Sequence, residues 1–300
     1  MPPSLWQRLL SLFRPAPRRQ IPSVADIRAV PVRAPSPPPT TARPPKPTPT
    51  LEELERLLAE ALKLAAPYAR PAFVPRTRAV APSEAPALPP AGSRFCGPAA
   101  LKPGEPWPAC KCGAPFQLFL QLNSADLPAA AAKPFGDGLL QFFFCAAGCD
   151  NDDYAPFSPA HLARVLPLSP DLRLASRPET PENETFPARV ISGWESPTTD
   201  IPNWEELEDL GVKLTEPQER ALYEADDERF PRDGDKLLGW PDWVQGVEYP
   251  NCPRCNTRMQ FLFQIDSEQN IPYMFGDCGV GHITICPTHR DVLAFGWACC

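Results

Sequence analysis

Two stretches of the chain decide the fold: CKCGAPFQLFLQLNS, at residues 110–124, and CPRCNTRMQFLFQIDS, at residues 252–267. They align with a shift of about 143 residues, and each places a cysteine pair directly before a run of alternating side chains. Alternation with a period of two is typical of a β-strand that packs one face against a core. The chain therefore contains an internal repeat whose unit is a cysteine turn followed by a strand.

The repeat continues beyond these strands. GDGLLQFFFC at residues 136–145 matches GDCGVGHITIC at residues 276–286, so each half contains a turn, a strand, a second turn and a second strand. The predicted inward faces of the first strands hold Phe116, Leu118, Leu120 and Leu122 in one half, and Met259, Phe261, Phe263 and Ile265 in the other. The pattern predicts an α+β fold of two pseudo-repeated, mainly antiparallel β-sheet units with a helical connector.

The second half contains four residues with the spacing of metal ligands. Cys252 and Cys255 form a C-x-x-C pair, and Cys286 and His289 form a C-x-x-H pair at the end of the returning strand. Two such turns at adjacent strand ends bring three soft sulfur ligands and one imidazole together. Zinc binds this ligand set tetrahedrally, and four protein ligands indicate a structural site.

The first half has a less regular version of the same arrangement. Cys110 and Cys112 are spaced as C-x-C, and Cys145 and Cys149 replace the C-x-x-H pair. We expect one or two structural zinc ions in the chain.

Burial of the thiols and disulfide formation are the competing interpretations of these cysteines. Recurrence of the pairs at turns in both halves favours ligation over burial. Disulfides require an oxidising compartment, and no secretory signal is recognisable at the N-terminus. The vicinal pair Cys299 and Cys300 offers an alternative fourth ligand in place of His289.

The segments LLGWPDWVQ, CPRC, LFQIDS, FGDCGVGHITI and WACC resemble the bacterial YwqG family over roughly residues 94–300. The cysteine-turn plan is also similar to the C-terminal domain of eukaryotic programmed cell death protein 2, whose relatives chaperone a small-subunit ribosomal protein. The resemblance implies a duplicated α+β fold, a bacterial cytoplasmic setting, and a family with no agreed enzymatic activity. Immunity against toxins is a role proposed for some members. The basic tail, the C-x-C pair and an acidic insertion depart from the family pattern.

Composition divides the chain into segments. The 44 prolines are concentrated near the N-terminus, where 22 fall in the first 100 residues and Lys and Arg outnumber Asp and Glu by 14 to 6. The predicted segments are a disordered, basic, Pro-rich tail at 1–49, a helix at 50–66, a Pro/Ala linker at 67–92, and a duplicated domain at 93–300. That domain consists of repeat one (93–150), an acidic connector (151–235) and repeat two (236–300).

The tail resembles a transit peptide or a membrane-surface anchor, so peripheral membrane contact is an alternative to a free cytoplasmic location. No run of 18 apolar residues predicts a membrane-spanning helix.

The connector carries most of the negative charge. Residues 150–235 hold 21 acidic and 8 basic residues, which argues against nucleic acid as the ligand. Helices are predicted to start at Ser158, Asn203 and Thr215. The last two are expected to bury Trp204, Leu207, Leu210, Leu222 and Tyr223. Their predicted outward faces form a docking surface for a basic protein: Glu205, Glu208, Asp209, Glu219, Asp226 and Glu228.

No established catalytic motif is present, and the chain has only three histidines. His289 is assigned to the metal, and His282 is predicted to be a half-buried structural residue. Two functional hypotheses follow. The first is a non-catalytic, zinc-stabilised protein-binding module, chaperone-like or immunity-like, with an acidic face for a basic protein. The alternative is a metal-dependent enzyme that uses an incompletely ligated cysteine–zinc site.

Overall fold

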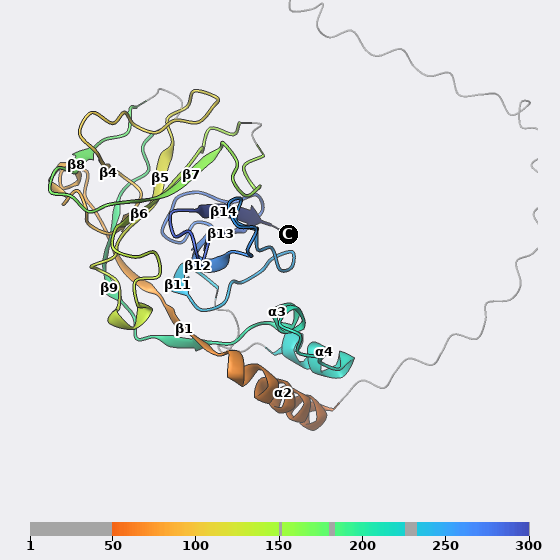
Figure 1. The fold of residues 1–300 in the computed structure, drawn as a ribbon. Helices are drawn as coiled ribbons and strands as arrows, with labels where there is room; N and C mark the ends of the chain where they lie inside the picture. Colours follow the sequence, from red (N-terminus) through yellow and green to blue (C-terminus); the bar gives the residue numbers. More distant parts are fainter. Residues whose placement is uncertain (1–49, 150–151, 180–183, 226–232, 300) are drawn as a thin grey trace, which may run out of the picture. The chain divides into compact units, whose positions relative to one another are not determined.

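The computed structural model describes residues 50–149, 152–179, 184–225 and 233–299, which fall in one compact unit (Figure 1). The predicted tail at 1–49, and the residues Asp226, Glu228 and Cys300, lie outside the described residues.

Two six-stranded antiparallel sheets make up most of the fold, which confirms the α+β prediction. Sheet I contains β2 (Pro75–Ala79), β9 (Arg189–Trp194), β3 (Arg94–Phe95), β5 (Gln117–Asn123), β6 (Leu139–Phe144) and β7 (His161–Leu166), in that order. Sheet II contains β10 (Thr198–Asp200), β1 (Arg70–Phe73), β11 (Lys236–Leu238), β12 (Gln260–Asp266), β13 (Val280–Ile285) and β14 (Leu293–Ala298).

The two sheets have the same plan. In sheet I a short strand, β3, precedes β5, β6 and β7, and in sheet II the short strand β11 precedes β12, β13 and β14. The returning strands β6 and β13 end directly before the third cysteine of each set, Cys145 and Cys286. A small separate ladder pairs β4 (Ala99–Leu101) with β8 (Arg173–Ala175). The order β3-β5-β6-β7 in sheet I therefore corresponds to the order β11-β12-β13-β14 in sheet II.

Two chain segments cross between the sheets. β1 belongs to sheet II and β2, which follows after one residue, belongs to sheet I; β9 and β10 make the reverse crossing. The prediction of a linker at residues 67–92 is therefore wrong. Proline fixes φ in the extended range and is compatible with a strand where its missing donor is not needed. Ala72 and Phe73, which lie between Pro71 and Pro75 in the chain, are buried.

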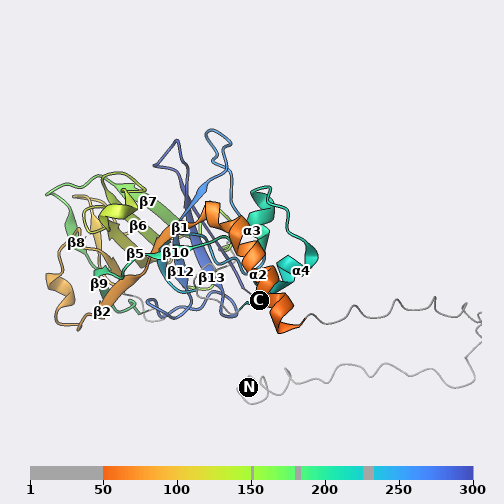
Figure 2. The same ribbon diagram turned by 90° about the horizontal axis from the view of Figure 1, so that it is seen from below.

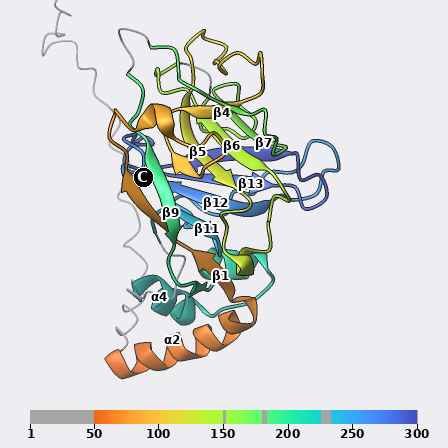
Figure 3. The same cartoon turned by 90° about the vertical axis from the view of Figure 1, so that its left-hand side faces the viewer.

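An aromatic core fills the space between the sheets. Phe142 of sheet I and Phe295 of sheet II lie with ring centroids 4.2 Å apart, and Phe95 and Phe263 lie 6.1 Å apart. Figure 3 shows β5, β6 and β7 in one layer and β12 and β13 in the layer behind it. Burying each such side chain stabilises the fold by about 1.5–3 kcal/mol.

The simple alternation predicted for the first strands is interrupted at the same place in both sheets. The register shifts between Leu118 and Leu120 in β5, and between Phe261 and Phe263 in β12. A bulge adds one residue to a strand and changes the face on which later side chains lie. Phe119, which alternation assigns to the outer face, consequently lies in the core.

The glutamines on the opposite faces of these strands have a structural role. Gln121 and Gln264 are fully buried and bind backbone groups rather than solvent. Gln121 Oε1 accepts from the Ala100 amide at 2.9 Å, and Gln264 Oε1 accepts from the Asp242 amide at 2.8 Å. The face of each sheet that points away from the shared core is therefore covered by a segment of its own half.

Three helices lie together at one end of the unit (Figure 2). The helix predicted at 50–66 is α2 (Leu51–Ala65), and the Thr50–Glu53 capping box that predicted its start is present. The connector helices are α3 (Trp204–Asp209), capped by Asn203, and α4 (Glu216–Glu224), capped by Thr215. Ala61 and Ala65 of α2 pack with Leu207 and Leu222 in a small apolar cluster, together with Ile201.

Several connector predictions are wrong. The segment after Ser158 is the strand β7 instead of a helix, because pairing with the buried strand β6 overrides the local helix signal. The connector also contains β8, β9 and β10. Tyr223 is 81% exposed, whereas its helix spacing predicted burial.

Candidate metal centres

A tight backbone turn holds the first two ligands of the second half. The Cys252 amide donates to the Thr257 carbonyl at 2.9 Å, and the Asn256 amide donates to the Cys252 carbonyl at 2.8 Å. Asn256 has φ of 55°, a left-handed conformation that asparagine tolerates better than most residues. The turn directs both thiols toward the end of β13, where Cys286 begins the second pair.

The second-half ligand atoms have the spacing of a tetrahedral zinc site. The Sγ atoms of Cys255 and Cys286 are 3.6 Å apart, and His289 Nδ1 is 3.7 Å from the Sγ atoms of Cys252 and of Cys286. All four ligand atoms lie within 4.8 Å of one another. Ligands around zinc at about 2.3 Å for sulfur and 2.0 Å for nitrogen are separated by about 3.6–3.8 Å. The chain therefore brings together the predicted set Cys252, Cys255, Cys286 and His289.

The first-half cysteines meet in the same way despite their irregular spacing. The Sγ atoms of Cys110 and Cys149 are 3.7 Å apart, those of Cys112 and Cys145 are 3.7 Å apart, and those of Cys145 and Cys149 are 3.5 Å apart. A disulfide would place two of these atoms about 2.05 Å apart. None of the four forms a disulfide, and together they make a cluster that could hold a metal ion.

The shorter C-x-C turn forms the same hydrogen bonds as the C-x-x-C turn. The Cys110 amide donates to the Ala114 carbonyl at 2.9 Å, as Cys252 does to Thr257, and Gly113 adopts positive φ, as Asn256 does. The missing residue is thus absorbed inside the turn, between the two cysteines. Both sequence-predicted ligand sets are complete in the structure.

A small apolar cluster lies under each set of ligands, separate from the main core. In the second half it contains Cys252, Met259, Cys286, Val292 and Ala294. Its counterpart under the first set is larger and contains Ala99, Cys110, Phe116, Leu118, Phe143, Cys145 and Ala160. A metal ion at either centre would therefore hold together two cysteine turns that are otherwise joined only by a small apolar cluster.

Hydrogen bonds favour the thiolate form at the exposed ligands. The pKa of Cys255 is lowered to about 6 because its sulfur accepts hydrogen bonds from the side chain and the backbone of Thr257. The pKa of Cys112 is lowered because of the backbone hydrogen bond from Ala114. Thiolate, not thiol, binds zinc, so these contacts prepare both turns for ligation.

An ion pair holds the two turns of the second centre together. Arg254, between Cys252 and Cys255, binds Asp291, which follows His289, through two hydrogen bonds of 3.0 and 2.6 Å. Paired contacts of this kind fix the orientation of a planar guanidinium.

The remaining cysteines are separate from the two centres. Cys96 is buried in the main core, and Cys278 is exposed. Cys299 is half-buried near Gly276 and belongs to neither four-ligand set, so it does not replace His289. The alternative ligand Cys300 lies outside the described residues.

The predicted acidic docking surface is smaller than the sequence indicated. Glu208 is exposed, and Glu205 and Glu219 are half-buried. Asp209 is exposed but paired with Arg258, so its charge is compensated.

Sequence analysis missed one carboxylate in this region. Glu206 is 2% exposed, and its Oε2 accepts hydrogen bonds from the Trp243 indole at 2.7 Å and from the Tyr249 hydroxyl at 3.3 Å. Burial raises its pKa. Its position three residues after Asn203 suggested a helix cap, and nothing in the local sequence indicated the contact with Trp243.

His282 is more deeply buried than predicted, at 5% exposure. Its ring packs against Trp243 with centroids 4.6 Å apart. Burial lowers its pKa to about 3, so the imidazole is neutral.

Among the described residues, no helix combines the length and hydrophobicity that crossing a membrane requires. No curated protein matches the chain. The model of a domain of unknown function, DUF1963, matches residues 93–296, about two thirds of the chain. This range contains both sheets' central strands and all eight candidate ligands. The chain therefore belongs to the DUF1963 family.

Proposed function

We propose that this protein is a non-catalytic binding module whose two halves are each stabilised by one zinc ion. The observation that carries the zinc assignment is the pair of four-ligand clusters, each with all ligand atoms within 4.8 Å of one another. One cluster offers four thiols, and the other offers three thiols and one imidazole. Soft sulfur ligands in a tetrahedral set favour zinc over calcium, magnesium or manganese.

A structural role fits both centres better than catalysis. A catalytic zinc keeps one coordination position for water or substrate, whereas four protein ligands fill the tetrahedron. Each ligand set also lies on a small apolar cluster that the metal would join to the sheet. These features support the binding module over the alternative of a metalloenzyme with an incompletely ligated zinc.

The proposed partner is a basic protein that docks on α3 and α4. Of the predicted acidic residues there, Glu208 is exposed, Glu205 and Glu219 are half-buried, and none of these three has an ion pair in the described part of the chain. Their carboxylates would attract Lys and Arg side chains at long range, and salt would screen the attraction. A chaperone-like or immunity-like role, as the YwqG resemblance implies, needs such a docking surface. No disulfide joins the cysteines of the described residues, which is compatible with the proposed cytoplasmic location.

The docking surface is tested by titrating the full chain with an oligolysine peptide at low and physiological salt. The double variant Glu208→Gln, Glu219→Gln should bind the peptide several-fold more weakly than wild type. A matched control, Glu55→Gln with Glu268→Gln, removes the same charge from exposed positions elsewhere. Equal loss in both variants would show only a net-charge effect and would contradict a docking surface on these helices.

A further inference from the structure

A pocket of about 600 Å³ opens on the outer face of sheet II. Its floor includes His282 and Thr284 of β13 and Gly296 of β14. Aromatic residues from two other segments form walls: Trp243 and Tyr249, whose ring centroids lie 5.0 Å apart, and Tyr154. Neither metal centre contributes a ligand residue to the lining.

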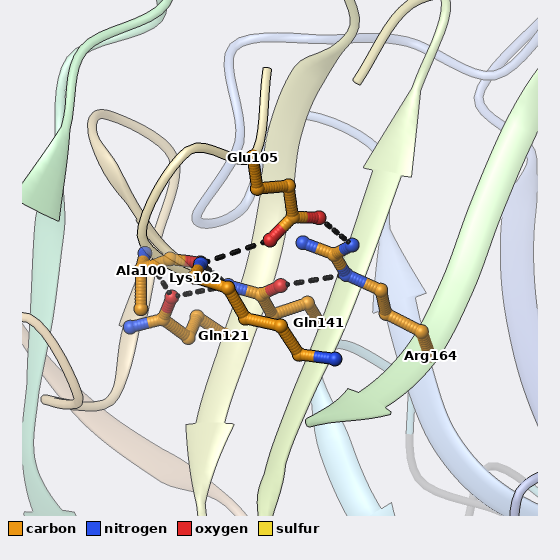
Figure 4. Close-up of polar contacts among 6 residues, drawn as sticks. All are labelled: Ala100, Lys102, Glu105, Gln121, Gln141 and Arg164. Carbon is orange, nitrogen blue, oxygen red and sulfur yellow. Dashed lines mark hydrogen bonds and ion pairs between the residues drawn. The ribbon is translucent and has the colours of Figure 1, made fainter. Parts of the chain in front are cut away.

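The corresponding place in sheet I is filled by a guanidinium group of the chain itself (Figure 4). Arg164 on β7 lies opposite Gln141 on β6 and donates from Nε to Gln141 Oε1 at 2.9 Å. Its Nη1 binds the Glu105 carboxylate, and its guanidinium carbon lies 5.6 Å from the ring centroid of Phe143. Arg164 therefore has an acceptor, a carboxylate and an aromatic ring as neighbours.

Sheet II carries smaller residues at the equivalent positions. β14 pairs with β13 as β7 pairs with β6, and the buried glutamines of β5 and β12 fix the alignment. The equivalent pairs are Gln141 with His282, Phe143 with Thr284, and Arg164 with Gly296. Glycine in place of arginine removes the guanidinium, and threonine in place of phenylalanine removes the ring beneath it. The pocket is the space that these two replacements leave.

Two buried polar atoms on the pocket floor have no hydrogen-bond partner among the described residues: His282 Nε2 and Thr284 Oγ1. The two side chains are 5% and 2% exposed. A buried polar atom left unpaired destabilises the folded chain, and a ligand that pairs with it removes that cost. The backbone of Asp242 forms a hydrogen bond with the His282 ring that acts to raise the pKa of the imidazole, against the larger effect of burial. A backbone carbonyl has this effect when it accepts from the ring, so Nδ1, the nitrogen that is not unpaired, is the donor. Nε2 of the neutral ring is then an acceptor.

Most donors of the lining side chains are already used inside the protein. The Trp243 indole and the Tyr249 hydroxyl donate to Glu206, and the Gln245 amide nitrogen donates to the Cys299 carbonyl. The Trp297 indole nitrogen has no hydrogen-bond partner among the described residues, but its ring packs against Phe275 in the core between the sheets and not over the pocket floor. The groups that face a ligand are therefore mainly acceptors.

The charge of the lining favours a cation. Glu248 is the charged residue among the described lining residues, and no Lys or Arg lies among them. Aromatic walls attract cations through their ring faces, and a flat guanidinium stacks on them. An anionic ligand would meet a carboxylate and no compensating cation.

We propose that this pocket binds a guanidinium group supplied by another molecule, in the place that Arg164 fills in sheet I. His282 Nε2 and Thr284 Oγ1 accept N–H bonds, Glu248 balances the charge, and Trp243 flanks the plane. The guanidinium belongs either to a small guanidino compound or to an arginine side chain of a bound peptide. The second source would make the pocket a specificity site of the proposed binding module.

Tryptophan fluorescence and calorimetry on the full chain test this with Nα-acetyl-arginine methylamide as the probe. The matched compound with citrulline has nearly the same shape but is neutral and carries a carbonyl. We expect the arginine compound to bind at least tenfold more tightly. Equal binding of the two compounds, or no saturable binding of either up to about 10 mM, would overturn the proposal.

Variants separate binding from folding. Thr284→Val removes the unpaired hydroxyl without changing the shape, so it should weaken binding about three- to tenfold while the melting temperature stays the same or rises. Thr198→Val is the matched control, since Thr198 Oγ1 is also buried and unpaired but lies outside the pocket. Gly296→Arg should abolish binding by restoring the arrangement of sheet I. If Thr284→Val and Gly296→Arg both bind as wild type does, the pocket is not the site.

A short arginine peptide distinguishes the sources. Tighter binding of the peptide than of the amino-acid derivative indicates a protein partner, and equal binding indicates a small compound. The oligolysine test of α3 and α4 substitutes Glu208 and Glu219 and leaves Glu205 unchanged. Glu205 lies close to Gly246, in the segment that borders the pocket, so substituting it could affect both proposed sites. Failure of one proposal therefore leaves the other measurable.

Discussion

Replacing Cys255 by serine should destabilise the second half far more than its packing explains. Cys255 is exposed, so the substitution creates no cavity in a core. Loss of stability must then come from loss of the bound metal. Cys278→Ser is the control, because Cys278 is also an exposed thiol in the same half but belongs to neither ligand set.

The size of the effect follows from the cluster under the second centre. Without the metal, the turn at Cys252 and the turn at Cys286 are joined mainly by Met259, Val292 and Ala294. Exposing Met259 and Val292 alone costs about 3–5 kcal/mol. For a folded unit of about 250 residues this lowers the melting temperature by roughly 6–20 °C.

Differential scanning calorimetry of protein purified under reduction measures the effect. Wild type and Cys278→Ser should melt together, and both should lose stability when a strong chelator is added. Cys255→Ser should melt lower and respond less to the chelator. A Cys255→Ser protein that melts with the control would refute the reasoning, because it would show that the thiols do not hold a stabilising ion.

Three further predictions concern charged groups. Asp291→Asn breaks the ion pair with Arg254, but both side chains are more than half exposed, so urea unfolding should change by less than about 1 kcal/mol. Asp200→Asn leaves Lys236 buried without a counter-charge, and the free energy of unfolding in urea should fall by about 3–5 kcal/mol. Burial raises the pKa of Asp235 to about 7, so its protonated form favours the folded state below about pH 4 and this contribution is lost as the pH rises through 7. Wild type should therefore lose stability relative to Asp235→Asn as the pH rises from about 4 to 7, and a constant difference between the two proteins over this range would contradict this.

The repeat and both ligand sets could be predicted from sequence because their signals are local. Cysteine turns have characteristic spacing, and the strands after them alternate over several residues. The capping residues Thr50, Asn203 and Thr215 also predicted three helix starts, since a cap depends on contacts within one turn.

Features that depend on distant partners could not be predicted in the same way. Pro71 and Pro75 suggested a linker, although pairing with β10, β11 and β9 makes their segment part of both sheets. The helix expected after Ser158 is a strand because β6 supplies an edge for pairing. The pocket could not be predicted because it depends on residues that differ between the two halves, whereas aligning the halves identifies the residues that they have in common. The role of Gly296 becomes visible only when it is compared with Arg164, the residue at the equivalent position of sheet I.

The central claim is that each half holds one zinc ion through four side chains. Native mass spectrometry and elemental analysis, on protein purified under reduction without chelator, test it most directly. Wild type should contain two zinc ions per chain, Cys112→Ser and Cys255→Ser should each contain one, and the double variant should contain none. Wild-type protein without zinc, or variants that keep both ions, would contradict the account.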